Sequence, residues 1–221
     1  MIVSASRRTD IPALYSEWFI NRLKEGYALV PNPYDRDRLS RVELTPKNVD
    51  CIVFWTKDPS AMFDKFQQLD RMGYRYCVHF TLTPYGRDIE PNLPPKPKLV
   101  QTFVEMSERI GAMRSVWRYD PVIVDAEHDV GWHLRRFGDM CGRLHEHTER
   151  CFISFVDPYK SAEERFRKLT GEEMTAIASG FSDIARKYGI ELFTCAENID
   201  LSGYGIGHGA CVDKKLIERI I

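Results

Sequence analysis

The chain has 221 residues, of which 43% are hydrophobic and 29% are charged. This balance excludes a disordered chain and a fibrous protein, and the length suffices to bury one substantial core. Lys and Arg total 31 against 32 Asp and Glu, a net charge of −1, which argues against broad binding of nucleic acids or membrane surfaces.

The sequence also carries no sign of membrane insertion or export. Its apolar runs are too short to span a bilayer, and charged residues interrupt the N-terminus before the core of a signal peptide could form. The six cysteines show no CxxC spacing, so we expect free thiols and predict no metal site. We therefore expect a cytoplasmic protein.

Short runs of β-branched and aromatic residues alternate along the chain with segments of helical periodicity. The predicted strands are 2–6, 51–55, 76–82, 113–119, 151–156 and 192–195. Four of the intervening helices are expected to end in a glycine just before the next strand: Gly26, Gly73, Gly111 and Gly189. Three Asp-Pro pairs directly follow strands and are expected to begin helices: Asp58-Pro59, Asp120-Pro121 and Asp157-Pro158.

Six strands that alternate with helices predict an α/β fold with a parallel sheet and right-handed crossovers. A complete eight-fold barrel typically takes about 250 residues, so we predict a partial (β/α)6 barrel of the TIM type. The alternative is an open, doubly wound sheet. We expect a single domain over residues 1–221, with a small hairpin insertion around residues 27–48.

Ligands of β/α folds bind beyond the carboxyl ends of the strands, and several cations follow the predicted strands. Arginine side chains bind carboxylate and phosphate groups in two-point fashion, so we predict a small anionic ligand. The expected binding residues are Arg7, Arg8, Arg118, Lys57, Tyr85, Tyr159 and His79. The expected acid, base or ligand carboxylates are Asp10, Asp120 and Glu197. The alternative is that these cations form a structural network with neighbouring aspartates.

The predicted strand 76–82 has an unusual second face. Tyr76, Val78 and Phe80 share one face, whereas His79 and Thr81 lie on the other. Because both faces of a covered parallel sheet are normally apolar, the polar face predicts a lined cavity. The alternative is a core histidine with its hydrogen bonds satisfied.

Glycines alternate in the segment 203–209, which precedes a predicted short helix at 213–221. Such a segment lets backbone N–H groups approach an anionic group. The spacing differs from the dinucleotide-binding fingerprint, and a merely flexible loop is the alternative.

Several segments together resemble a known prokaryotic family. They are SASRRTDIP at 4–12, FWTKDP at 54–59, WRYDP at 117–121, CFISF at 151–155, CAE at 195–197 and ACVD at 210–213. The chain is similar in these segments to the family called domain of unknown function 1848. Longer members of that family end in a cysteine cluster resembling the iron–sulfur motif of radical S-adenosylmethionine enzymes, whose cores are six-unit partial barrels.

Three functions follow as hypotheses. The first is an enzyme core that binds an anionic, nucleotide-like small molecule at the strand ends. The second, implied by the resemblance, is a radical S-adenosylmethionine enzyme core. Residues 1–221 lack a CxxxCxxC motif, so an iron–sulfur cluster and S-adenosylmethionine would require a further C-terminal cysteine tail. The third is a non-catalytic module that binds a ligand or associates with nucleic acid.

Overall fold

The structure is a computed structural model. It describes residues 1–5, 9–32, 34–35, 37–157, 165–195, 197 and 199–221. Arg7, Arg8 and Tyr159, which the sequence offers as ligand-binding residues, therefore lie outside the described residues.

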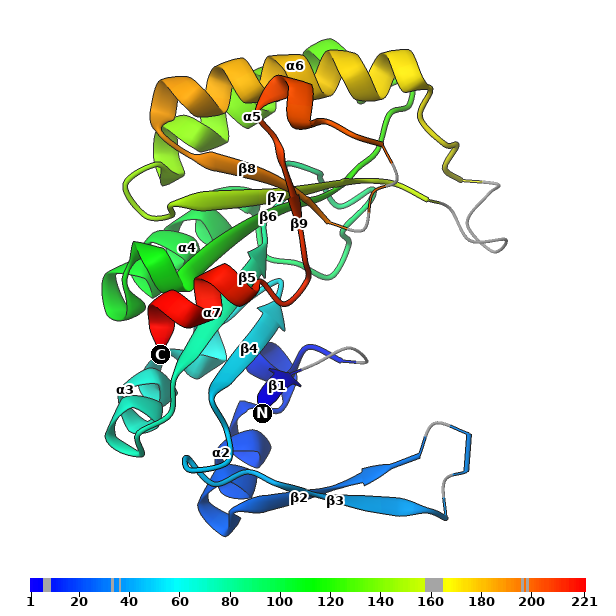
Figure 1. Cartoon of the computed structure of the whole chain (residues 1–221). Coiled ribbons are helices and arrows are strands. Elements are labelled where there is room, and N and C mark those ends of the chain that lie inside the picture. Colours follow the sequence, from blue (N-terminus) through cyan, green and yellow to red (C-terminus); the bar gives the residue numbers. More distant parts are fainter. Residues whose placement is uncertain (6–8, 33, 36, 158–164, 196, 198) are drawn as a thin grey trace.

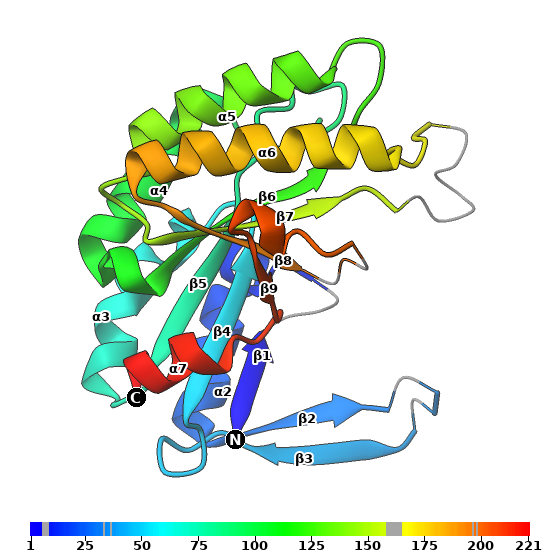
Figure 2. The same ribbon diagram turned by 45° about the horizontal axis from the view of Figure 1, so that its top comes forward.

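The described residues form one large parallel sheet, which curls into a half-barrel (Figures 1 and 2). Its strands, in spatial order, are β1 (Ile2–Ala5), β4 (Cys51–Thr56), β5 (Tyr76–Thr81), β6 (Ser115–Val122), β7 (Arg150–Phe155), β8 (Glu191–Cys195) and β9 (Gly207–Gly209). Every neighbouring pair is parallel. The predicted α/β half-barrel is confirmed, and each of the six predicted strands is present. The seventh strand, β9, forms within the predicted glycine loop.

Helices cover the convex side of this sheet (Figure 1). They are α2 (Ser16–Glu25), α3 (Phe63–Arg71), α4 (Lys96–Ile110), α5 (Val130–Leu144) and α6 (Gly171–Tyr188), with a short α1 (Ile11–Leu14) before α2. On β5, Tyr76 and Phe80 face these helices; Tyr76 stacks on Phe66 of α3 and Phe80 packs on Phe103 of α4. Burial of an aromatic side chain of this size stabilises the fold by about 1.5–3 kcal/mol.

The predicted glycines do mark helix ends. Gly26 and Gly189 cap α2 and α6 in the left-handed conformation, with φ of 80° and 70°. There each glycine N–H donates to carbonyls of the last helical turn, a position where a side chain would be strained. Gly73 and Gly111 also have positive φ.

One predicted helix start is wrong. Asp120-Pro121 lies inside β6 and begins no helix. The β6–β7 register moves from Tyr119↔Ile153 to Val122↔Phe155, so Asp120 and Pro121 together lie opposite a single β7 residue. A bulge of this kind re-aims side chains at the rim of a barrel.

The amino-terminal half of the concave side is filled by α7 (Lys214–Ile220), which crosses in front of the sheet in Figures 1 and 2. Leu216, Ile217 and Ile220 of α7 join an apolar cluster with inward-facing residues such as Cys51 and Cys77. Asp213 caps α7, and its other carboxylate oxygen accepts a hydrogen bond from buried Arg150 (2.8 Å). The predicted C-terminal helix is therefore fixed against the concave side, and it leaves the carboxyl half to a different set of residues.

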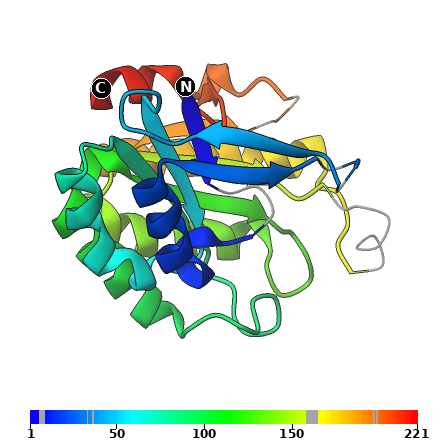
Figure 3. The ribbon, with the colours of Figure 1, turned by 90° about the horizontal axis from the view of Figure 1, so that it is seen from below.

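The predicted hairpin is also present. β2 (Tyr27–Pro31) and β3 (Leu39–Glu43) pair antiparallel as a separate two-stranded sheet, which lies below the β1 edge (Figures 1 and 3). None of the helices formed by the described residues is both long and apolar enough to cross a bilayer.

Candidate functional site

The carboxyl half of the concave side holds Arg118 and His79 between the same two aromatic rings. The guanidinium carbon of Arg118 lies 5.1 Å from the ring centre of Trp55 and 5.6 Å from that of Phe152. The His79 ring lies 4.3 Å from Trp55 and 5.6 Å from Phe152. These residues come from β4, β5, β6 and β7, and strand alternation points all four side chains to the concave side.

Each of the two basic side chains has a buried nitrogen without a hydrogen-bond partner among the described residues: Nη1 of Arg118 and Nδ1 of His79. Arg118 is 5% exposed and His79 is 1% exposed. A buried polar group without a partner costs about 1–3 kcal/mol and is rare in native proteins. A third such nitrogen among the described residues, Nε of Arg150, lies beside the cap of α7. The two on the adjacent strands β5 and β6 share the same aromatic rings and indicate a binding site.

The electrostatics of the pair are asymmetric. Burial holds the pKa of His79 well below its usual range, and the guanidinium groups of Arg118 and Arg150 lower it further. Both effects favour the neutral imidazole. Burial opposes the charge of Arg118, but the Asp120 carboxylate and the Cys195 thiol hold its pKa above the ordinary value.

Asp120 fixes the orientation of Arg118. Nε of Arg118 donates to Oδ2 of Asp120 (3.0 Å), and Nη2 donates to the same oxygen. The other carboxylate oxygen accepts a hydrogen bond from the Ser154 hydroxyl. Ser154 is the β7 residue opposite the bulge, so the irregular pairing of β6 and β7 is what brings Asp120, Arg118 and Ser154 together.

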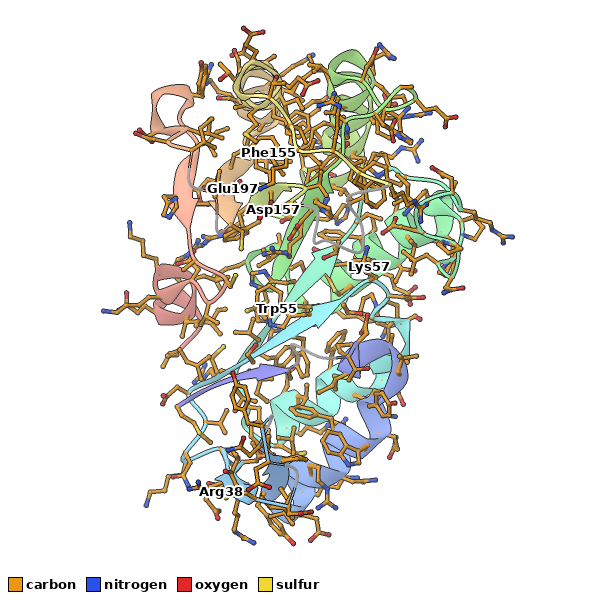
Figure 4. All side chains as sticks on the ribbon, turned by 90° about the vertical axis from the view of Figure 1, so that its right-hand side faces the viewer. Arg38, Trp55, Lys57, Phe155, Asp157 and Glu197 are labelled. Atoms are coloured by element: carbon orange, nitrogen blue, oxygen red, sulfur yellow. The ribbon has the colours of Figure 1, made fainter. Side chains whose placement is uncertain are left out.

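Glu197 lies beside this group at the end of β8. Its Oε1 accepts a hydrogen bond from the backbone N–H of Phe155 (2.8 Å). Burial raises the pKa of Glu197, and the carboxylates of Asp120 and Asp157 add to the rise. Figure 4 shows Phe155, Asp157 and Glu197 gathered at the ends of β7 and β8. A carboxyl group in this setting is suited to donate or accept a proton.

The thiol of Cys195 faces Arg118 and lies 3.0 Å from the sulfur of Cys211. The cluster implied by the family resemblance needs three closely spaced thiolates, and these two do not supply them. The other described cysteines are buried: Cys51, Cys77, Cys141 and Cys151. The described residues therefore do not fit an iron–sulfur cluster.

Two predicted site residues have other roles in the structure. Asp10 accepts hydrogen bonds from Ala13 N (2.9 Å), Thr56 Oγ1 (2.9 Å) and Lys57 N (2.8 Å), so it caps α1 and ties it to the end of β4. The Lys57 amino group pairs with the buried carboxylate of Glu90, which Lys96 also contacts. The alternative of cations paired with neighbouring aspartates is met by Arg118, which pairs with Asp120, whereas Lys57 pairs with a glutamate.

The contacts of Tyr85 are likewise structural. Its hydroxyl donates to the carbonyl of Pro121 (2.8 Å) and accepts from the N–H of Ile123 (2.8 Å), while its ring stacks on Trp132 of α5. Tyr85 thereby fastens the segment that follows the bulge.

For Trp55, which lies near a strand end, the sequence favours core packing over stacking on a base or sugar, and it gives Phe152 no role. Both rings form the aromatic walls of the site. A signal was available for Trp55. Cys51, Val53 and Trp55 occupy every second position of β4 and so share one face, and β4 pairs with β5 in the register Trp55↔His79. For Phe152, whose strand also carries apolar residues on its convex face, we find no local signal.

Two other polar clusters lie on the described surface. Asp88, Glu127 and His128 have ligand atoms within 4.8 Å of one another on the loops after β5 and β6. Between α4 and α5, a cleft of about 300 Å³ is lined by three cations, Lys96, Arg136 and Arg143, and by the carboxylate of Asp139. This cleft is a second place where an anion could bind.

Comparisons with known proteins identify the family. Among solved structures, the chain is similar to a crystal structure of a "putative alpha-L-fucosidase" from Bacteroides thetaiotaomicron VPI-5482, at 12% identity, over 72% of this chain and 68% of that chain. The TM-score of 0.36 is too low to carry any inference about function. No curated protein matches the chain. The family model described as a domain of unknown function, DUF1848, matches residues 2–221, and the chain belongs to this family.

Proposed function

We propose that the chain is the core of an enzyme that binds a small anionic molecule on the concave side, at the carboxyl ends of β4 to β8. The observation that carries this proposal is the buried, unpartnered Nη1 of Arg118 next to the unpartnered Nδ1 of His79. An anionic oxygen would satisfy Nη1 with a charge-assisted hydrogen bond, the stronger class of such bonds.

The surroundings of Arg118 favour an anion that carries a flat group. Asp120 engages only Nε and Nη2, so the guanidinium is held in place while Nη1 has no hydrogen-bond partner. Trp55 is partly exposed, and its indole N–H is fixed by Ser4 Oγ (3.0 Å). Aromatic faces stack on bases and other planar rings. We therefore place nucleotides first among the candidate ligands.

The same site has groups for proton transfer. Glu197, with its raised pKa, is the proposed general acid. Asp120, held between Arg118 and Ser154, is the proposed base or substrate ligand. A carboxyl group with a raised pKa beside a charge-paired carboxylate is a common arrangement for acid–base work. We also propose a cytoplasmic location, where reducing conditions would keep the thiols free.

The test is a titration with defined anions. Phosphate, pyrophosphate, AMP and citrate are screened by thermal shift, and the most stabilising anion is titrated by calorimetry against the wild-type chain, Arg118→Lys and Arg143→Lys. Lysine can keep the ion pair with Asp120, but it lacks the guanidinium group and therefore has no nitrogen in the position of Nη1. Loss of one charged hydrogen bond costs about 1.5–3 kcal/mol, so Arg118→Lys should weaken binding by about tenfold or more.

Arg143→Lys is the matched control, because Arg143 lines the cleft between α4 and α5. Its affinity should equal that of the wild-type chain. If Arg143→Lys loses affinity while Arg118→Lys keeps it, the anion binds in the outer cleft and the proposal is wrong. The proposal also fails if none of the anions stabilises the wild-type chain. Circular dichroism of both variants confirms that they are folded.

A further inference from the structure

The thiols of Cys195 and Cys211 lie together although 16 residues separate them in the chain. Cys195 ends β8 and pairs in register with Gly209 of β9, and Cys211 follows two residues later. Their sulfur atoms are 3.0 Å apart, about 1 Å from bonding distance. Cys195 is buried and Cys211 is exposed, and both are free thiols in the structure.

We propose that Cys195 and Cys211 are a reversible oxidation site, which forms an intramolecular disulfide by exchange with a low-molecular-weight disulfide such as oxidised glutathione. The proposal rests on the sulfur geometry and is independent of anion binding at Arg118.

The reaction takes two exchange steps. The exposed Cys211, as its thiolate, attacks one sulfur of the small disulfide; a bond to Cys211 forms, and one small thiolate leaves. The Cys195 thiol then gives up its proton, and its sulfur attacks Sγ of Cys211 and expels the second small thiolate. The two cysteines are oxidised by two electrons in all, and the small disulfide is reduced to two thiols.

The surroundings of Cys195 favour the second step. Burial, together with the neighbouring Cys211 thiol, raises the pKa of Cys195 to about 11, whereas the guanidinium of Arg118 acts to lower it. Once Cys211 is in a mixed disulfide, its thiol no longer opposes ionisation of Cys195, and the stabilising charge of Arg118 remains. The buried thiol is therefore placed to resolve the mixed disulfide rather than to start the exchange.

A metal site is the competing use of two close thiols. Structural sites for soft metals take four ligands, commonly cysteine and histidine. Within the described parts of the chain, no further His, Cys, Asp or Glu joins the two sulfurs in a group of three ligand atoms. The pair therefore fits a disulfide better than a metal centre.

The new bond would have a structural consequence. It would join the end of β8 to the segment that leads into α7, the helix that fills the amino half of the concave side. It would also consume the thiol that faces Arg118. Oxidation would thus fasten the C-terminal segment over the concave side.

The test treats the reduced, folded chain with oxidised glutathione and measures intact mass. We expect the wild-type chain to lose the mass of two hydrogens and, after denaturation, to show two fewer thiols that react with N-ethylmaleimide. Peptide mapping should join Cys195 to Cys211, and dithiothreitol should restore both thiols.

Two variants separate the steps. Cys195→Ser should stop as a glutathione adduct on Cys211, and Cys211→Ser should stay unmodified while folded. The proposal is wrong if the wild-type chain also stops at the adduct or does not react. It is equally wrong if mapping finds another pair, such as Cys51 with Cys77. Because no anion is added, these outcomes are read separately from the test of the proposed function.

Discussion

Replacing Asp10 with alanine distinguishes a structural carboxylate from a catalytic one. In the structure Asp10 caps α1 through Ala13 N and also accepts hydrogen bonds from Thr56 and the backbone of Lys57. Loss of a helix cap costs about 1 kcal/mol, and each further bond to a charged acceptor at least about 1.5 kcal/mol. Asp10→Ala should therefore lower the free energy of unfolding by about 4 kcal/mol.

For a chain of this length, 1 kcal/mol shifts the thermal midpoint by about 2–4 °C. The expected fall for Asp10→Ala is thus about 8–16 °C by calorimetry. Asp10→Asn keeps one carbonyl oxygen for the cap and should lose about half as much. A midpoint unchanged within about 2 °C, together with lost anion binding, would refute this reasoning and return Asp10 to the site.

Three further substitutions and one control substitution test the packing around the site. Tyr85→Phe leaves two backbone groups without their partner and should cost about 1–3 kcal/mol in urea unfolding. Glu90 is buried, which raises its pKa, but two lysines hold that pKa below the ordinary value of a glutamate. The ionised Glu90 therefore stabilises the fold at pH values above the ordinary pKa, and this stabilisation is lost as the pH falls. Glu90→Gln should thus destabilise the chain at pH 7 and much less in acid. A Cβ on Gly209 would lie 2.5 Å from the Phe152 ring, so Gly209→Ala should cost about 1–3 kcal/mol. Gly203→Ala, with open space at its Cβ, should change stability by less than about 0.5 kcal/mol.

The fold could be predicted from local signals. The alternation of short apolar runs with amphipathic segments, and the glycines at helix ends, depend on residues close in sequence. Two features of the fold that differ from the prediction, the bulge in β6 and the strand β9, depend on residues that are distant in sequence. The bulge at Asp120 is defined by its pairing with Ser154 of β7. Gly207 and Gly209 form a strand where their missing side chains leave room for Phe193 and Phe152.

The site was predictable in part for the same reason. The rule that ligands bind at strand ends selected Arg118, Asp120 and Glu197, which the structure brings together, and the polar face of β5 selected His79. The same rule also selected Lys57 and Tyr85. Lys57 pairs with Glu90 in a loop, and Tyr85 bonds Pro121 in the bulge of β6, and no local pattern identifies either partner. Which cation keeps a nitrogen without a hydrogen-bond partner is decided by these distant contacts.

The most direct measurement is a crystal structure of the wild-type chain soaked with the anion that binds most tightly in solution. We expect electron density for the anion within hydrogen-bond distance of Arg118 Nη1, between the rings of Trp55 and Phe152. Density confined to the cleft of Lys96 and Arg143, with Arg118 Nη1 bonded to the protein itself, would contradict the account.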